Sequence, residues 1–211
     1  MPEYSIIYLK YAAICLICYV AGSIPTAYII GKLIKKIDIR QHGSGNVGAT
    51  NAFRVLGKKW GIVTLILDML KGFIPVYLIT IYLLSFTERP GDEKNFVRLL
   101  SGLMIVIGHI YTMFLGFTGG KGVAAAAGFL LALTPVEMGL TITVFIMVLL
   151  KTKMVSLSSI ISALTYPLFL IIWKEPRIII IFATAISLLI IIKHRTNIQR
   201  IIAGAENKIK F

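Results

Sequence analysis

The sequence predicts an all-α, polytopic integral membrane helical bundle with about seven transmembrane helices, its N-terminus outside and its C-terminus cytoplasmic. Composition is the first observation behind this prediction: 57% of the residues are hydrophobic, only 15% are charged, and the mean hydropathy is +0.87, which excludes an ordinary soluble protein. The second is that several apolar stretches approach or exceed the roughly 20 residues that a helix needs to cross the hydrocarbon core. Because one bundle would use nearly the whole chain, we expect a single transmembrane domain over residues 1–211.

Apolar runs between polar segments give the expected spans in order. They lie near residues 5–33, 61–86, 97–116, 122–134, 136–150, 155–173 and 177–193. The fourth and fifth are short and are separated only by Thr134 and Pro135, so residues 122–150 form either two full crossings or a re-entrant hairpin. The first apolar segment lacks the basic start and small-residue cleavage pattern of a signal peptide, and we expect it to be retained.

The orientation follows from Lys and Arg in the loops, which are enriched on the cytoplasmic side. With the N-terminus outside, fifteen of the 22 basic residues lie on the inner side, whereas six lie outside and Lys71 lies within a span. The inner residues are Lys32, Lys35, Lys36, Arg40, Arg54, Lys58, Lys59, Lys121, Lys151, Lys153, Lys193, Arg195, Arg200, Lys208 and Lys210. This scatter over short loops argues against a nucleic-acid partner despite the net charge of +13. The predicted orientation also places every glycine-rich or polar loop on the cytoplasmic side.

The first of these loops, Gly43 to Arg54, contains three glycines and four hydroxyl or amide side chains among its first nine residues. Glycines let backbone N–H groups converge on an anion, hydroxyls add donors, and a guanidinium fits a phosphate in a bidentate way. We therefore interpret the loop as a phosphate site, with a flexible interhelical connection as the alternative. The candidate ligands are Ser44, Gly45, Asn46, Gly48, Thr50, Asn51 and Arg54.

The second loop, Gly116 to Val123, follows one expected span and opens another, so its amides are expected to crown a helix N-terminus and to bind an anion. Its candidate residues are Gly119, Gly120, Lys121 and Gly122. It is not a Walker A loop, because Leu115 stands where the first glycine is needed and Gly122 where Ser or Thr is needed. A lysine that merely caps a turn is the alternative.

Two further cytoplasmic segments carry polar side chains. Ser156 and Ser159 share a helical face, although serines in membrane helices are often packing residues, and which of Ser156, Ser158 and Ser159 lines a site is left open. His194 and Asn197 follow the last span, where a positive-inside anchor would explain the flanking basic residues equally well.

Charges inside the spans are costly unless paired. Asp68 and Lys71 are one helical turn apart, which predicts a structural ion pair, with a proton or ion pathway as the alternative. We interpret His109 as a packing residue. Neither the histidines nor the Cys15 and Cys18 pair have the spacing of a metal site, so no metal and no cofactor is expected.

Six motifs in the same order resemble those of the PlsY family of acyl-phosphate-dependent glycerol-3-phosphate acyltransferases, from about residue 20 to Glu206. They are Gly22 to Pro25, Ser44 to Arg54, Gly108-His109, Gly119 to Ala124, Val155 to Leu157, and Lys193 to Arg195 with Asn197 and Ile198. The resemblance implies a multi-pass enzyme of the bacterial cytoplasmic (inner) membrane whose active site faces the cytoplasm. It would move a fatty acyl group from acyl phosphate to the sn-1 hydroxyl of glycerol 3-phosphate, giving lysophosphatidic acid and phosphate for phospholipid synthesis.

The matching motifs also imply roles for individual residues. The expected catalytic residues are Ser44, Arg54, Lys121, His194 and Asn197. The expected substrate-binding residues are Gly45, Asn46, Gly48, Thr50, Asn51, Gly119, Gly120, Gly122, Ser156 and Ser159. The expected partners are acyl phosphate, glycerol 3-phosphate and membrane lipid, with no nucleic acid and no obligate protein partner. Which phosphate each basic residue binds stays open.

A transporter for an anionic solute is the main alternative function, because glycine loops and the Asp68/Lys71 pair could line a path. Such a path needs polar residues on both faces, and the expected outer loops, 86–95 and 173–177, contain few glycines and no cluster of donors. A purely structural membrane subunit would leave the loop composition unexplained.

Overall fold

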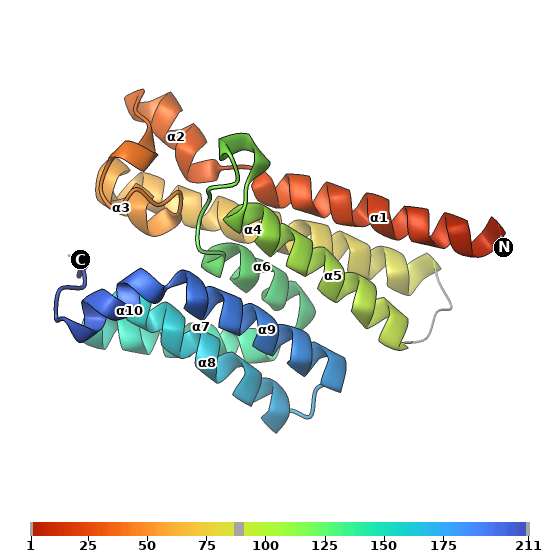
Figure 1. Cartoon of the computed structure of the whole chain (residues 1–211). Coiled ribbons are helices and arrows are strands. Elements are labelled where there is room, and N and C mark those ends of the chain that lie inside the picture. Colours follow the sequence, from red (N-terminus) through yellow and green to blue (C-terminus); the bar gives the residue numbers. More distant parts are fainter. Residues whose placement is uncertain (1, 87–90, 210–211) are drawn as a thin grey trace. The chain divides into compact units, whose positions relative to one another are not determined.

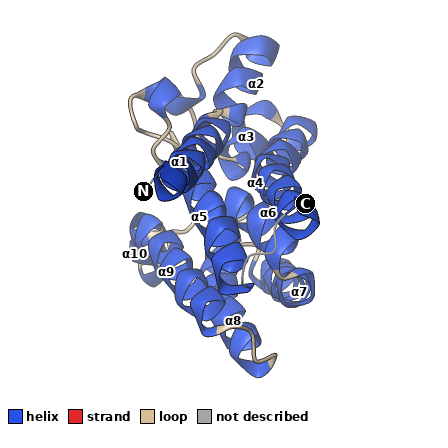
Figure 2. Cartoon of the chain, turned by 90° about the vertical axis from the view of Figure 1, so that its right-hand side faces the viewer, coloured by secondary structure: helices blue, strands red, loops and turns tan. Residues whose placement is uncertain are grey.

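The structure is a computed structural model that describes residues 2–86 and 91–209, and within them every regular element is a helix (Figures 1 and 2). The expected all-α class is therefore confirmed. Arg89 and Lys210, two of the basic residues counted for the orientation, lie outside the described residues. The chain divides into two compact units, residues 1–133 and 134–211, and each is considered by itself.

In the first unit, the most extensive helix contacts are those of α4 (Lys58–Phe86) with α6 (Val123–Leu133) and of α1 (Pro2–Ser23) with α5 (Gly91–Ile110). Pro25, which cannot donate a backbone hydrogen bond, stands at the break between α1 and α2. The helices are α1 (Pro2–Ser23), α2 (Thr26–Lys35), η1 (Ile39–Gln41), α3 (Ala49–Leu56), α4 (Lys58–Phe86), α5 (Gly91–Ile110), η2 (Met113–Leu115) and α6 (Val123–Leu133).

Glycines let α4 and α6 approach so closely that the backbone of one helix contacts that of the other. A Cβ added at Gly72 would overlap the carbonyl oxygen of Ala125, and one added at Gly128 would overlap that of Met69. Small residues at such crossings allow the close van der Waals packing on which helix association in membranes depends.

Gly72→Ala is expected to destabilise the first unit, because the α4–α6 crossing must open to admit the methyl group. Overpacking of this kind costs about 1–3 kcal/mol, so the thermal midpoint of the purified protein in detergent should fall. Gly139→Ala is the matched control: its Cβ meets nothing within 4 Å in α7, and exchanging glycine for alanine in a helix stabilises by about 1 kcal/mol. Equal midpoints for the two variants would contradict the close crossing.

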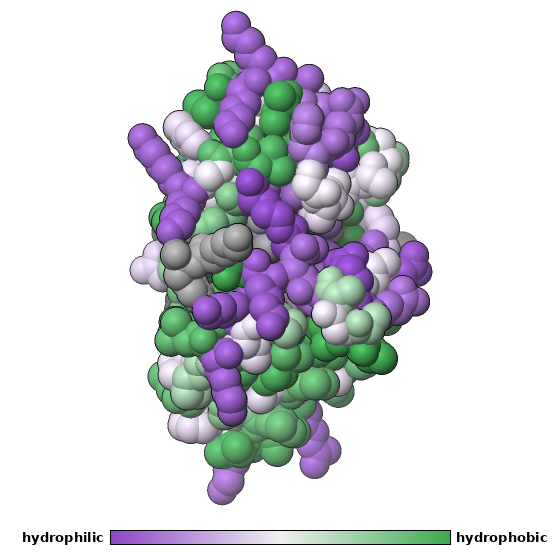
Figure 3. All heavy atoms as spheres, turned by 90° about the vertical axis from the view of Figure 1, so that its left-hand side faces the viewer, coloured by the Kyte–Doolittle hydropathy of each residue, from purple (hydrophilic) through white to green (hydrophobic). Residues whose placement is uncertain are grey.

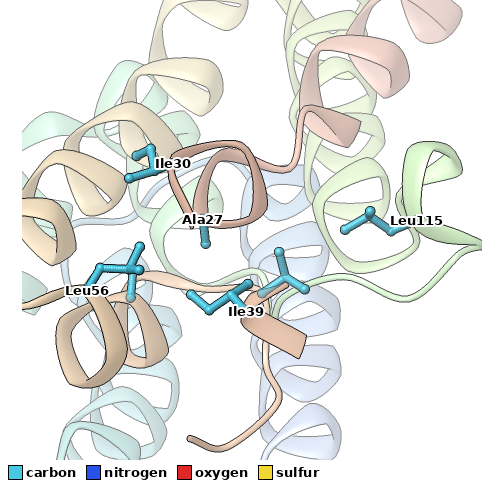
Figure 4. Close-up of a cluster of buried hydrophobic side chains, with 7 residues drawn as sticks. Ala27, Ile30, Ile39, Leu56 and Leu115 are labelled. Carbon is cyan, nitrogen blue, oxygen red and sulfur yellow. The ribbon is translucent and has the colours of Figure 1, made fainter. Parts of the chain in front are cut away.

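A hydrophobic cluster holds together the loop end of the first unit, which lies away from the N-terminus (Figures 1 and 4). Its members come from α2, η1, α3, η2 and the loop before α3, so their burial fixes these short elements against one another. The buried residues are Ala27, Ile30, Ile39, Val47, Ala52, Leu56 and Leu115.

The second unit consists of α7 (Pro135–Thr152), α8 (Val155–Ile172), α9 (Arg177–Lys193) and α10 (Arg195–Ile202), with α8 packed against both α7 and α9. Proline at the first position of α7 costs no hydrogen bond, since that N–H would have no intrahelical partner. The backbone N–H of Ile209 donates to the carbonyl of Lys153 over 2.8 Å, which ties the segment after α10 to the α7–α8 turn.

Five segments among the described residues are long and apolar enough to cross a membrane, or six if the pair α9 and α10, bent by 59°, forms one span. The five are Tyr8–Lys35, Lys58–Tyr82, Lys94–Leu115, Pro135–Thr152 and Val155–Ile172. The span expected near residues 122–134 is the 11-residue helix α6, about 16 Å long at 1.5 Å per residue and too short for a full crossing. Seven crossings are therefore not confirmed, and the orientation stays a prediction.

Candidate active site

Asn51 holds the first glycine-rich loop in place. Its side-chain amide donates to the carbonyls of Ile39 (3.2 Å) and His42 (3.0 Å), and its Oδ1 accepts from the backbone N–H of Ser44 (2.9 Å). Asn51 is buried on α3, which forms the second half of the segment expected to be a loop from Gly43 to Arg54. It therefore joins the N-terminal half of the loop to the helix that follows; whether it also contacts a substrate stays a prediction.

Asn51→Ala is expected to destabilise the loop, because it removes three hydrogen bonds and leaves the backbone N–H of Ser44 without its acceptor. The two carbonyls still accept from the N–H groups of His42 and Gly45. Each lost bond contributes about 0.5–1.5 kcal/mol, so the thermal midpoint should fall by several degrees. Asn46→Ala is the control in the same loop, since the Asn46 side chain makes none of these three bonds. A midpoint for Asn51→Ala equal to that of Asn46→Ala would show that the three bonds do not hold the loop.

The second glycine-rich loop folds back along the end of α5. The N–H of Gly119 donates to the carbonyl of Ile110 and the N–H of Gly120 to that of His109, both over 3.0 Å. The prediction that these two amides point at an anion is therefore wrong, because both are used inside the fold. The same holds for Gly45, whose N–H donates to the carbonyl of His42 over 3.1 Å. Anion binding must then rely mainly on side chains and on other amides of the two loops.

The two loops meet at one cavity of about 380 Å³. Ser44, Gly45, Asn46 and Gly119 from the predicted set line it. The lining residues between positions 40 and 47 come from the end of the first unit that carries α2 and α3 (Figure 1). Figure 3 is a view from that side and shows hydrophilic side chains among hydrophobic ones. The remaining lining residues are Arg40, Val47 and Thr118.

Arg40 lines the cavity, although from the sequence it was expected only as one of the basic residues of the inner loops. Its guanidinium forms an ion pair with Asp38 (Nη2 to Oδ2, 2.7 Å) and lies over the ring of Tyr28, 5.3 Å from the centroid. The hydrogen bonds from Arg40 lower the pKa of Asp38 to about 2, so the pair is ionised at neutral pH. Its position two residues after an acidic residue and four before Ser44 is the only sequence signal that pointed to it.

The other predicted residues of the first unit lie outside the lining of this cavity. Gly48 is the residue before the first turn of α3, Thr50 is half-buried and Arg54 is exposed on that helix. Lys121 is half-buried, and Gly122 adopts a left-handed φ of 87° directly before α6. Their roles toward substrate stay predictions.

In the second unit, the carboxylate of Glu206 accepts hydrogen bonds from two predicted site residues, Ser156 and Asn197. Its Oε1 accepts from Ser156 Oγ (2.8 Å) and from Asn197 Nδ2 (2.7 Å), and its Oε2 accepts from Arg200 Nε (2.8 Å). Ser156, Asn197 and Glu206 are buried. We call these four residues the Glu206 cluster. It links α8, α10 and the segment after α10.

The hydroxyls of Ser158 and Ser159 bond to their own helix instead. Ser158 Oγ donates to the carbonyl of Met154 (2.8 Å) and Ser159 Oγ to that of Val155 (2.9 Å). Of the three serines left open by the sequence, Ser156 is thus the one that the structure joins to Asn197 through a carboxylate. The ring of buried His194 interacts through Nδ1 with the carbonyl of Ile190 over 2.8 Å.

Glu206 was not predicted as a site residue, although it marks the end of the matching motifs. Burial raises its pKa, but the hydrogen bonds from Asn197, Arg200 and Ser156 together outweigh burial and hold the pKa below its ordinary value of 4.5. The sequence signal that could have indicated Glu206 is that it is an isolated acidic residue in a basic C-terminal segment. Its partners could not be assigned from sequence because they depend on how α8 and α10 pack.

The predicted Asp68/Lys71 ion pair is confirmed inside the first unit. Lys71 Nζ lies 2.8 Å from Asp68 Oδ1, and both side chains are buried. The pair lies within Lys58–Tyr82, a segment long and apolar enough to cross a membrane, where an unpaired charge would be costly.

The fold and the cavity define a class: an integral membrane helical protein with a polar cavity between two glycine-rich loops, suited to an anionic substrate. A family model for glycerol-3-phosphate acyltransferases matches residues 12–204, and the chain belongs to that family. This membership identifies an enzyme and disfavours the transporter alternative.

Known glycerol-3-phosphate acyltransferases are similar in sequence to this chain over nearly its whole length. The glycerol-3-phosphate acyltransferase of Chlorobium chlorochromatii is 39% identical, covering 94% of this chain and 97% of its own, and that of Chlorobaculum tepidum is 38% identical, covering 96% and 98%. Two crystal structures of PlsY (YgiH), an integral membrane glycerol 3-phosphate acyltransferase, match with 39% identity over 95% of this chain and 96% of theirs. Their TM-scores are 0.86 for the glycerol 3-phosphate form and 0.83 for the lysophosphatidic acid form.

Proposed function

We propose that this acyltransferase takes its fatty acyl group from acyl phosphate and delivers it to the sn-1 hydroxyl of glycerol 3-phosphate, forming lysophosphatidic acid and inorganic phosphate. The observation that carries the proposal is the cavity shared by the Ser44 and Thr118–Gly119 loops in a member of this family. It offers a guanidinium, hydroxyls and an amide to a phosphorylated molecule. The glycerol 3-phosphate and lysophosphatidic acid forms of the similar structures support the acceptor and the product.

The chemistry asks little of the protein, because a mixed carboxylic-phosphoric anhydride is already activated. The glycerol hydroxyl oxygen forms a bond to the acyl carbon, the bond from that carbon to the phosphate oxygen breaks, and the hydroxyl proton passes to a phosphate oxygen of the substrates. Catalysis then consists of positioning the two phosphates and stabilising the charge of the departing one.

We assign Ser44, the backbone of residues 46–48 and Lys121 with the backbone of Gly122 to the phosphate of the acyl donor. Arg54, in the first unit, is assigned to glycerol 3-phosphate. In the second unit, Ser156 and Glu206 help to hold Asn197, which with His194 stays a predicted catalytic residue. Since several loop amides are used inside the fold, the charged side chains supply most of the electrostatic stabilisation in this assignment.

We further propose that the enzyme lies in the cytoplasmic membrane of a bacterium, with its N-terminus outside and its active site facing the cytoplasm. The excess of Lys and Arg in the loops on that side supports this orientation. The fatty chain would enter between the helices from the inner leaflet. Cysteine scanning of Lys36 and Lys174 with a membrane-impermeant thiol reagent, in a background without Cys15 and Cys18, should label only Lys174→Cys in intact cells.

Donor specificity tests the proposed reaction. Purified protein in detergent receives glycerol 3-phosphate with either acyl phosphate or acyl-CoA, and both lysophosphatidic acid and released phosphate are measured. We expect product only with acyl phosphate, in equal amounts with phosphate. Transfer from acyl-CoA at a comparable rate would refute the proposed donor.

A further inference from the structure

A buried polar group lies between the broken first helix and the second glycine-rich loop. Asp68 Oδ1 accepts from Thr26 Oγ1 (2.5 Å) and pairs with Lys71 Nζ (2.8 Å), which also donates to the carbonyl of Ile24 (2.8 Å). His109 Nδ1 lies 3.6 Å from the same carboxylate oxygen. One carboxylate on α4 thus contacts α2 and the end of α5.

The other side of the His109 ring packs against the glycine-rich loop. A Cβ added at Gly120 would overlap His109 Nε2, and one added at Gly119 would overlap the backbone carbonyl of His109. That carbonyl also accepts the N–H of Gly120. His109 therefore holds the loop by its backbone and by its ring, directly before Lys121.

Besides the Asp68–Lys71 ion pair, this group contains buried polar atoms that the pair does not satisfy. Among the described residues, Asp68 Oδ2 and His109 Nδ1 are buried side-chain atoms without a hydrogen-bond partner. Unsatisfied polar groups and charges at membrane depth are costly. A hydrophobic contact would pack these helices at lower cost, so stability alone does not account for the arrangement.

We propose that Asp68 and His109 are positioning residues that set the place of the 119–121 loop and thereby of Lys121. The ion pair with Lys71 and the bond from Thr26 fix the carboxylate, the carboxylate fixes the His109 ring, and the ring and carbonyl of His109 fix Gly120. Neither residue needs to touch substrate. This inference deepens the proposed function, on which its kinetic part rests.

The test compares three variants. Asp68→Asn combined with Lys71→Met removes both charges, so no unpaired charge is left buried. His109→Asn keeps an amide near the Nδ1 position but removes the part of the ring beneath Gly120. Ser101→Ala is the matched control: its buried hydroxyl donates to the carbonyl of Val97 on α5 and does not reach the loop.

Steady-state kinetics give the first readout. We expect the KM of acyl phosphate to rise about tenfold to hundredfold in both test variants, because a displaced loop loses phosphate contacts. The kcat should fall as well, because a displaced Lys121 no longer stabilises the charge of the departing phosphate. Ser101→Ala should match the wild type. An unchanged KM in either test variant, even with a lower thermal midpoint, would assign the group to structure alone and overturn the proposal.

Affinity for inorganic phosphate, measured as the rise in thermal midpoint with phosphate concentration in detergent, separates the two hypotheses. The test variants should lose most of this rise, and Ser101→Ala should keep it. If acyl phosphate is not a donor but phosphate affinity still falls only in the test variants, the proposed function fails and the positioning role stands. If phosphate affinity is the same in all four proteins, the positioning role fails.

Discussion

Lys121→Ala is expected to lower kcat/KM for acyl transfer by about 10²–10³-fold, the loss typical of one donor that stabilises charge developing in the transition state. The expectation follows from the place of Lys121 in the loop whose two preceding amides are used inside the fold. Its ammonium group is then the principal cation that this loop can offer to the departing phosphate. Release of phosphate from acyl phosphate and glycerol 3-phosphate in detergent measures the effect.

Lys58→Ala is the control for loss of a basic side chain in the same unit, because Lys58 is exposed at the start of α4 and has no assigned role. It should retain the wild-type rate. Lys121→Arg should recover part of the activity, since it restores the charge but not the shape of the donor. A Lys121→Ala enzyme with a near-normal rate would remove Lys121 from the mechanism.

Glu206→Ala is expected to be the most destabilising single change in the second unit. It leaves buried Ser156 and Asn197 without their shared acceptor and removes the ionic partner of Arg200. Two buried groups that lose this acceptor cost about 2–6 kcal/mol, and activity should fall because the side chain of Asn197 is no longer held in place. The thermal midpoint in detergent measures the loss, and Asn207→Ala, an exposed neighbour, should leave it unchanged. A midpoint unaffected by Glu206→Ala would show that the Glu206 cluster does not hold the unit together.

The same carboxylate should make stability depend on pH. Because the pKa of Glu206 is lower in the folded protein than its ordinary value of 4.5, its contribution is fully present above that value and is lost as the pH falls through the folded pKa. The thermal midpoint of the wild type should therefore decline below about pH 4.5 more steeply than that of Glu206→Gln, in which this group no longer titrates. Parallel curves would contradict the lowered pKa.

Composition and hydropathy were sufficient for the class of protein because the solvent of most of the chain is lipid, and the length of an apolar helix that spans it is set by the bilayer. The same rule marks the apolar run near residues 122–134 as short, and its helix α6 has 11 residues. Hydropathy alone left open whether residues 122–150 form two full crossings or a re-entrant hairpin, because the length of an apolar run does not specify how neighbouring helices pack.

The sequence by itself determined the two loops rich in glycine and hydroxyls, the family resemblance and the pairing of Asp68 with Lys71, because each of these depends on residue type at short spacing. Only the tertiary structure decided that the N–H groups of Gly119 and Gly120 donate to carbonyls at the end of α5. It also decided that Arg40 and Thr118 line the cavity and that Glu206 joins Ser156 to Asn197. These contacts connect residues far apart in the chain or use backbone groups that every residue has. A hydrogen bond of that kind is selected by packing, and residue type alone does not specify its partner.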